Sequence, residues 1–214
     1  MLGFPLGVLT VNGLEWVLHK HVLHGTPRPG QGRYSPRPTS MKSHWAHHKQ
    51  VRVNRFYDDA YTEGWKNWRY RNEVESIIAL TVVTSPIAVV APFYYAGMVY
   101  AGVNYFLTHR KAHLDTEWAK KNVPWHYDHH MNSNQDANWC VTRPWFDYIM
   151  GTRVASSPEL MESNPLGIKL PSLIEAPLNR IARKLMPSAF ERLDSNMRME
   201  KDNRQKGIEL PMPE

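Results

Sequence analysis

The sequence predicts an all-α fold, specifically a membrane-associated helical bundle. Two observations predict it: long apolar blocks of helical length, and a distribution of charge that avoids those blocks. The net charge is +6, yet no Lys or Arg occurs before Lys20 or between Val74 and Thr108. Basic residues confined to segments outside apolar blocks are typical of membrane proteins with cytoplasmic basic loops, and not of nucleic-acid-binding proteins. We therefore expect a membrane as a partner and no nucleic acid.

The first predicted helix covers residues 2–18. This run is about as long as a short membrane span, although glycines, Asn12 and Glu15 interrupt it. It continues directly into His19 and Lys20 without a small-residue cleavage site, so we do not expect a cleaved signal peptide.

A loop is predicted over residues 25–39, where four prolines and three glycines disfavour regular structure. Helix can resume at Ser40 or Ser43, because either serine can cap a helix.

Residues 74–108 form the second apolar block. As one helix they would be about 50 Å long, well over the roughly 30 Å of a bilayer core. Pro86 and Pro92 disfavour a continuous helix. Histidines precede and follow the block, so both of its ends lie on the same side if the histidines share a site. We expect a hairpin that dips into the membrane or packs on the first helix. A soluble protein with an apolar core helix is the alternative.

The chain after Gly151 is more polar. Ile174, Leu178, Ile181 and Leu185 recur at helical spacing, with basic residues on other faces. This pattern predicts an amphipathic helix that lies on a membrane surface or packs on the rest of the protein. Residues 201–214 are expected to be disordered. We divide the chain into a domain over residues 1–155 and a polar tail over residues 156–214.

A single cysteine, Cys140, excludes a disulfide framework and a thiolate-rich zinc site. We interpret it as a buried thiol without a chemical role, in a protein whose ligand-bearing parts face a reducing compartment such as the cytoplasm.

All eleven histidines fall into four clusters. Residues three or four apart share one face of a helix, so most of these clusters present several imidazoles in one direction. Buried without a metal, so many rings would leave polar nitrogens unsatisfied or cations repelling each other. The clusters therefore predict metal binding; they are His19, His21 and His24; His44, His47 and His48; His109 and His113; and His126, His129 and His130.

The spacing of His19 and His24 does not fit a regular α-helix. Five residues correspond to about 140° around the axis, so the two rings should diverge unless the helix ends or they bind different metals. This spacing favours a two-metal site between helices.

Ligand chemistry narrows the choice of metal. Imidazole suits iron, zinc, copper and nickel, whereas calcium and magnesium prefer oxygen ligands. About ten histidines are too many for one tetrahedral zinc. A histidine-rich dinuclear site, with iron that carries out oxygen chemistry, is the best fit. Zinc can replace iron during isolation because it binds nitrogen ligands more tightly.

Four motifs, in order along the chain, resemble the histidine boxes of the fatty acid hydroxylase and sterol desaturase superfamily. They are HKHVLH at 19–24, HWAHH at 44–48, HRKAH at 109–113 and HYDHH at 126–130. The long apolar block between the second and third boxes is also similar, and the resemblance covers residues 14–152. The family usually has more membrane spans before the first box than this sequence contains. The third box is shorter than in carotene hydroxylases.

The resemblance implies an integral membrane protein in which two Fe ions, held by histidines on the cytosolic side, use O2 and externally supplied electrons to hydroxylate or desaturate a lipid. Residues 1–155 would then form the catalytic domain, and His21 has no counterpart in its box. The ligands implied by the boxes are His19, His24, His44, His47, His48, His109, His113, His126, His129 and His130.

Other residues are candidates for supporting roles. Nearby polar residues are candidates to hydrogen-bond the ligand rings and so orient them: Glu15, Asp115, Asp128, Asn104, Asn132, Asn134 and Asn138. Aromatic residues can line an apolar substrate groove: Trp16, Phe93, Tyr94, Tyr95, Tyr105 and Trp125. Asp147 and Thr152 are expected to be structural.

The chain has no dinucleotide-binding fingerprint and no c-type haem motif, so a separate ferredoxin- or cytochrome-type electron donor is expected. Other possible functions are a di-iron oxygenase of a small soluble metabolite, a carotenoid hydroxylase, a lipid desaturase, and a non-enzymatic metal-binding or storage protein.

Overall fold

The computed structural model describes residues 2–25, 39–132 and 135–205, and every regular element in these ranges is a helix. The predicted all-α class is therefore confirmed. The chain forms two compact units, Met1–Leu114 and Asp115–Glu214. Most of the predicted loop, residues 26–38, lies outside the described residues. The proposed catalytic boundary at residue 155 concerns function and stays a prediction.

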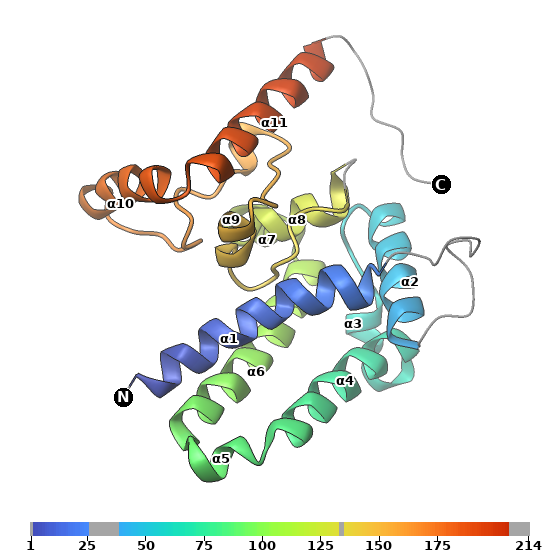
Figure 1. Ribbon diagram of the computed structural model, residues 1–214. Coiled ribbons are helices and arrows are strands. Elements are labelled where there is room, and N and C mark those ends of the chain that lie inside the picture. Colours follow the sequence, from blue (N-terminus) through green and yellow to red (C-terminus); the bar gives the residue numbers. More distant parts are fainter. Residues whose placement is uncertain (1, 26–38, 133–134, 206–214) are drawn as a thin grey trace. The chain divides into compact units, whose positions relative to one another are not determined.

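Within the described residues, the first unit contains four helices of at least 15 residues, two of which carry histidines (Figure 1). None of the described helices combines the length and the apolar character needed to cross a membrane. Helix α2 begins at Thr39, close to the predicted start at Ser40. The elements are α1 (Gly3–Leu18), the π-helix η1 (His19–Leu23), α2 (Thr39–Val53), α3 (Ala60–Glu63), the 3₁₀ helix η2 (Gly64–Lys66), α4 (Trp68–Thr84), α5 (Ile87–Val90) and α6 (Pro92–Leu114).

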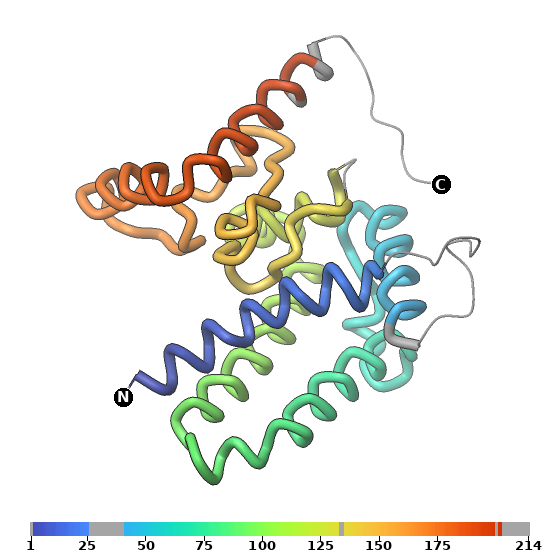
Figure 2. The backbone as a smooth tube through the Cα atoms, in the orientation of Figure 1, coloured from blue at the N-terminus to red at the C-terminus, as the bar shows by residue number. Residues whose placement is uncertain are grey.

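The second apolar block forms the predicted hairpin. Helices α4 and α6 run side by side and are joined through the short α5, as the backbone trace shows (Figure 2). Pro86 immediately precedes α5 and Pro92 begins α6. Since proline has no backbone N–H to donate within a helix, these two residues fix where the block turns.

Helix α6 packs along α1. This contact agrees with the expectation that the hairpin packs on the first helix. The two helices approach so closely at Gly7 and Gly97 that a Cβ on either residue would collide with the backbone of the other helix, at Tyr94 and Phe4 respectively. The Tyr94 hydroxyl also donates to Thr10 Oγ1 at 2.8 Å. Glycine at these two positions therefore allows the N-terminal parts of α1 and α6 to pack closely against each other.

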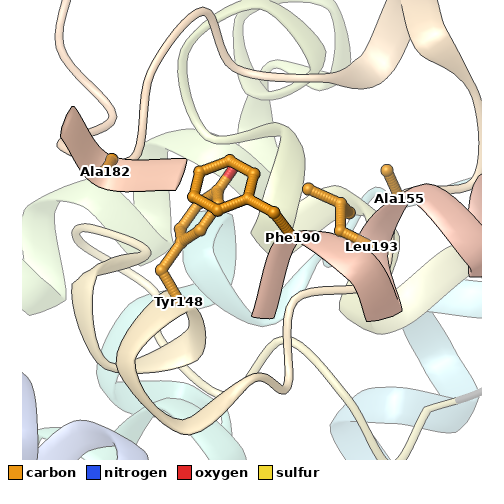
Figure 3. Close-up of a cluster of buried hydrophobic side chains, with 5 residues drawn as sticks. All are labelled: Tyr148, Ala155, Ala182, Phe190 and Leu193. Carbon is orange, nitrogen blue, oxygen red and sulfur yellow. The ribbon is translucent and has the colours of Figure 1, made fainter. Parts of the chain in front are cut away.

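The second unit contains shorter helices and two longer C-terminal ones. Its apolar core comprises Tyr148, Ala155, Ala182, Phe190 and Leu193 (Figure 3). The elements are α7 (Thr116–Asn122), α8 (Pro124–Met131), α9 (Trp145–Met150), the 3₁₀ helix η3 (Pro158–Leu160), α10 (Ser172–Leu185) and α11 (Pro187–Gln205).

Two predictions for the tail have different outcomes. The amphipathic helix is confirmed as α10. The prediction of disorder from residue 201 is wrong for residues 201–205, because α11 continues to Gln205. Helix α11 is tied to the core through Phe190 and Leu193, and its polar C-terminal part consists mostly of residues with favourable helix propensity.

Candidate metal centre

The first histidine cluster consists of His19, His24, His44 and His48. Each can offer a ring nitrogen within 4.8 Å of every other member. The Nε2 atom of His44 lies 3.1 Å from Nε2 of both His19 and His48, and Nε2 of His24 lies 3.3 Å from that of His48. An ion held at about 2.0–2.1 Å by tetrahedral nitrogens would separate them by about 3.3 Å. The nitrogens are thus spaced as the ligands of one ion would be.

The spacing of five between His19 and His24 is explained by η1. This segment is a π-helix, in which the amide of His24 donates to the carbonyl of His19 at 2.9 Å. The i→i+5 bond of a π-helix places residues five apart above one another. The two ring centroids are consequently 5.2 Å apart. The regular α-helix ends at Leu18, so the divergence expected on a continuous α-helix does not arise, and both rings enter the same cluster.

The second histidine cluster consists of His47, His109 and His113, whose ligand atoms also lie within 4.8 Å of one another. His109 and His113 are four apart on the regular helix α6. Helix α2 contributes to both clusters, because His47 turns to the second while His44 and His48 turn to the first. One helix therefore supplies imidazoles to both clusters.

Asp58 orients His47. Its Oδ2 lies 2.6 Å from Nδ1 of His47, so that nitrogen holds the proton and leaves Nε2 as the ligand atom. Arg69 donates to Oδ1 of the same carboxylate at 2.7 Å, as does the amide of Ala60 at 2.9 Å. Burial would raise the pKa of Asp58, but His47 and Arg69 hold it well below its usual value. Asp58 is therefore a fixed anion facing the imidazole.

Glu73 and Tyr61 orient His109. Nδ1 of His109 lies 2.6 Å from Glu73 Oε1 and 2.7 Å from the Tyr61 hydroxyl, which donates to Glu73 Oε2 at 2.6 Å. Burial would raise the pKa of Glu73, but His109 and Tyr61 lower it. Burial and the Glu73 charge raise the pKa of Tyr61 well above its ordinary value. At neutral pH a protonated phenol and a carboxylate therefore hold this ring.

A strained turn orients His113. Nδ1 of His113 donates to the Phe56 carbonyl at 2.9 Å. Arg55 and Phe56 have φ angles of +55° and +81°, in the left-handed region that non-glycine residues rarely adopt. Such residues cost on the order of 1–3 kcal/mol each and persist where the surrounding structure holds them. The turn directs this carbonyl toward the ring.

The second unit carries the fourth histidine group, His126, His129 and His130, all fully buried on α8. The ring centroids of His126 and His130 are 4.7 Å apart. Nδ1 of His129 donates to the Ala137 carbonyl at 2.7 Å, which again leaves Nε2 as the available ligand atom. The next residue, Asn138, has a φ of +59°. In both units, therefore, a histidine ring donates to the carbonyl of a residue that has a positive φ angle or directly precedes a residue that has one.

Three of the polar residues predicted to orient the ligands have other partners. Asp115 caps α7 through the Trp118 amide at 2.9 Å, and Asn138 bonds both backbone polar groups of Val154 at 2.8 Å. Asp128 pairs with Arg153 at 2.8 Å within the second unit. The orienting roles of Asn104 and Asn132 stay predictions, and Asn134 lies outside the described residues.

The remaining predictions for single residues are largely confirmed. Asp147 accepts from the Trp139 and Cys140 amides at 2.8 and 2.9 Å and from Thr152 Oγ1 at 2.7 Å, which is the expected structural role. Cys140 is a buried free thiol. His21 is exposed and stays outside both clusters.

A cavity of about 500 Å³ opens beside the histidines in the first unit. His19 and His44 of the first cluster and His47 and His109 of the second lie in its wall, with Glu15, Tyr61 and Glu73. The remaining wall comes largely from α1, α4 and α6 and is mostly aliphatic: Val11, Leu14, Leu18, Val22, Leu23, Ile77, Leu80, Met98 and Val99.

The prediction that aromatic residues line this space is mostly wrong. Of the candidates only Tyr105 contributes to the wall. The others are used in packing or are exposed: Trp125 donates to the Val141 carbonyl at 2.9 Å, and the Tyr95 hydroxyl donates to the Thr81 carbonyl at 2.9 Å. Apolar character alone did not distinguish lining residues from packing residues.

The first unit's clusters fit metal ions. Burial lowers the pKa of His44 and His113 well below the usual value, and neighbouring imidazoles lower it further. Neutral imidazoles are the form that binds metals. In the second cluster all three Nδ1 atoms face oxygen acceptors, which is the arrangement typical of metal-ligating histidines.

The all-helical fold of the described residues and the two buried histidine clusters are those of a histidine-box protein and are consistent with a metal centre. The chain belongs to the fatty acid hydroxylase family, whose model matches residues 4–152, and the resemblance seen in the four boxes is confirmed. Enzymes of this family are di-iron oxidoreductases and are typically membrane-bound. Comparisons with curated proteins and with solved structures gave no match.

Proposed function

We propose that this protein is a di-iron, O2-dependent hydroxylase that acts on an aliphatic C–H bond of a lipid-like substrate such as a fatty acyl chain or a sterol-like lipid. The observation that supports it best is the cavity, whose wall joins histidines of both clusters to a long aliphatic surface. When bound, two iron ions would supply the activation of O2 for C–H oxidation. Electrons would come from a separate ferredoxin- or cytochrome-type donor, for which the basic net charge is suitable.

The proposed ligands are the ten histidines implied by the boxes. Those of the first unit are His19, His24, His44 and His48 for one ion and His47, His109 and His113 for the other. We propose that His126, His129 and His130 complete the coordination, on the basis of the family's box pattern and their complete burial.

The residues of the chain would have distinct tasks in this reaction. Asp58 and Glu73 hold the Nδ1 protons of two ligand rings, so that Nε2 stays available to the metal. The aliphatic residues of α1, α4 and α6 bind the hydrocarbon and exclude water. Tyr61 keeps a protonated hydroxyl in the cavity wall, where it donates to Glu73 and helps to hold the His109 ring.

We further propose that the hairpin dips into a membrane at the turn between α4 and α6, with the metal centre facing the cytoplasm. Val83, Val89, Val90 and Phe93 gather there and are largely exposed. No charged residue occurs between Ser76 and Thr108, so this region can enter the acyl layer without burying a charge. A lipid could then reach the cavity between the same helices directly from the bilayer.

The test is anaerobic iron loading followed by Mössbauer spectroscopy and by turnover with O2, a reductant and lipid substrates. A coupled iron pair and an O2-dependent hydroxylated lipid are expected. His47→Ala and His129→Ala should abolish turnover and lower the iron content, whereas His21→Ala should retain both because His21 is exposed. A spectrum without a coupled pair, or equal losses at His21, would contradict the proposal.

The other functions give different results in the same assay. A storage protein would load iron without consuming O2 in the presence of substrate and reductant. An oxygenase of a small soluble metabolite would turn over a non-lipid and ignore acyl chains and sterols. A desaturase would produce an alkene in place of an alcohol, and a carotenoid hydroxylase would prefer a polyene.

A further inference from the structure

Helix α10 turns its apolar face away from the unit to which it belongs. Leu173, Ile181 and Leu185 are 85, 55 and 75% exposed. Eight and four residues separate them, so they occupy one face of the helix. A helix in a water-soluble domain normally buries such a face.

The opposite side of α10 is the one that packs on the protein. It contributes Ala182 to the core of the second unit (Figure 3). Asn179 Nδ2 donates to the Ser163 carbonyl at 2.7 Å, and Glu175 Oε1 accepts from Asn164 Nδ2 at 2.7 Å. Small and polar residues therefore hold the helix in place, while its large aliphatic residues are left for another partner.

Two cations border the apolar face along one edge. Arg180 and Lys184 are one helical turn apart and exposed, next to the row that contains Leu173. Arg183 has a different role, because it pairs with Asp194 at 2.9 Å and covers the Phe190 ring. The surface offered by α10 is thus a stripe of aliphatic side chains with a positive border.

We propose that α10 lies in the plane of a lipid surface that carries anionic headgroups. Its aliphatic residues would enter the boundary between headgroups and acyl chains, and Arg180 and Lys184 would meet the phosphates. This combination of an apolar stripe and flanking cations is what an anionic membrane surface complements. A second copy of α10 would instead bring like charges together. The helix lies beyond residues 4–152, the part that matches the family, so this anchor is separate from the hairpin.

The test places an environment-sensitive fluorophore on the full-length, iron-loaded protein through Leu173→Cys or Ile181→Cys. Met199→Cys on α11 is the control, because Met199 is 53% exposed and lies on another helix of the same unit. The native Cys140 is buried and should not react. The probes are vesicles of phosphatidylcholine alone and of phosphatidylcholine with phosphatidylglycerol.

A blue shift at positions 173 and 181 with phosphatidylglycerol vesicles, smaller with phosphatidylcholine alone and absent at 199, is the expected result. Protein that fails to bind vesicles, or binds without a shift on α10, overturns the proposal. A blue-shifted signal in the absence of vesicles also overturns the proposal. If that signal grows with protein concentration, a second copy of the protein covers the apolar face. If it does not, another part of the same chain covers the face.

Charge variants test the headgroup contact. The double substitution R180Q/K184Q should weaken binding to phosphatidylglycerol vesicles at low salt by roughly tenfold to thirtyfold. The control R198Q removes an exposed cation from α11 and should leave binding nearly unchanged. Equal effects of the two would overturn the specific role of α10. None of these readouts depends on iron coupling or turnover, so the anchor and the proposed hydroxylase activity can fail independently.

Discussion

Helices α1 and α6 lie side by side, and a pair of histidines belongs to η1 and its C-cap, which continue α1, and another pair to α6, but the two pairs are spaced differently. His109 and His113 are four apart on a regular α-helix, whereas His19 and His24 are five apart across a π-helix. The two rings of each pair nevertheless enter the same cluster, the first cluster for His19 and His24 and the second for His109 and His113. The backbone hydrogen-bond pattern therefore decides which imidazoles meet, and the number of intervening residues is not sufficient by itself.

The two clusters also differ in the irregular backbone conformation on which each depends. The first cluster depends on a π-helical turn, which is rare and often found at functional sites. The second cluster uses a regular helix for its pair but requires the left-handed residues Arg55 and Phe56 to supply a carbonyl to His113. Each cluster thus contains one unfavourable local conformation, which the surrounding packing stabilises.

The largest expected effect comes from changing the spacing on the regular helix. An alanine inserted between Arg110 and Lys111 rotates His113 by about 100° relative to His109. We expect loss of metal from the second cluster and of turnover, measured by metal analysis and product formation. An alanine inserted after Leu114 is the control and should retain the metal of both clusters in the first unit.

Shortening the spacing of the first pair should have a smaller effect than lengthening that of the second. Deletion of Val22 shortens the spacing of His19 and His24 to four, which a regular α-helix can accommodate on one face. The first cluster should therefore retain more metal than the second does after insertion. If the variant with the insertion in α6 forms a new π-turn and keeps its full metal content, the two histidine pairs do not differ in their sensitivity to spacing.

An intermediate effect is expected from the carboxylates that orient the second cluster. Asp58→Asn and Glu73→Gln should each lower metal affinity or turnover by about 10- to 100-fold, the usual effect of losing such a partner. Asp59→Asn is the matched control, because Asp59 also pairs with Arg69, at 2.9 Å, and is far more exposed than Asp58. Metal titration and steady-state turnover measure the effect, and a loss at Asp59 as large as at Asp58 would contradict it.

The smallest expected effect concerns the contact between the two helices. Gly97→Ala places a methyl group against the Phe4 backbone and should destabilise the fold by about 1–3 kcal/mol. Gly102→Ala on the same helix meets only Ile77 Cγ2 at 3.7 Å and should be neutral or slightly stabilising. Denaturant unfolding measures both, and equal stability of the two variants would show that α1 and α6 can separate without cost.

The partners of the ligand rings illustrate what could not be predicted. Asp58 is 11 residues from His47, and Glu73 is 36 residues from His109 on another helix. No periodicity links residues at such separations. The candidates named from the sequence lay close to the boxes along the chain, and the observed partners of the second cluster were brought there by the folding of α3, α4 and the turn at Phe56.

The sequence by itself determined the helical class, the turn of the hairpin at Pro86 and Pro92, the amphipathic helix in the tail, and the four histidine boxes of the family. These depend on local properties: helical period, the missing amide of proline, and side-chain chemistry. Tertiary structure alone decided that His19 and His24 meet across a π-turn, that distant acids hold the ligand rings, and that α10 turns its apolar face outward. Each depends on which surfaces pack together, and the free energy of that packing comes from contacts between segments far apart in the chain.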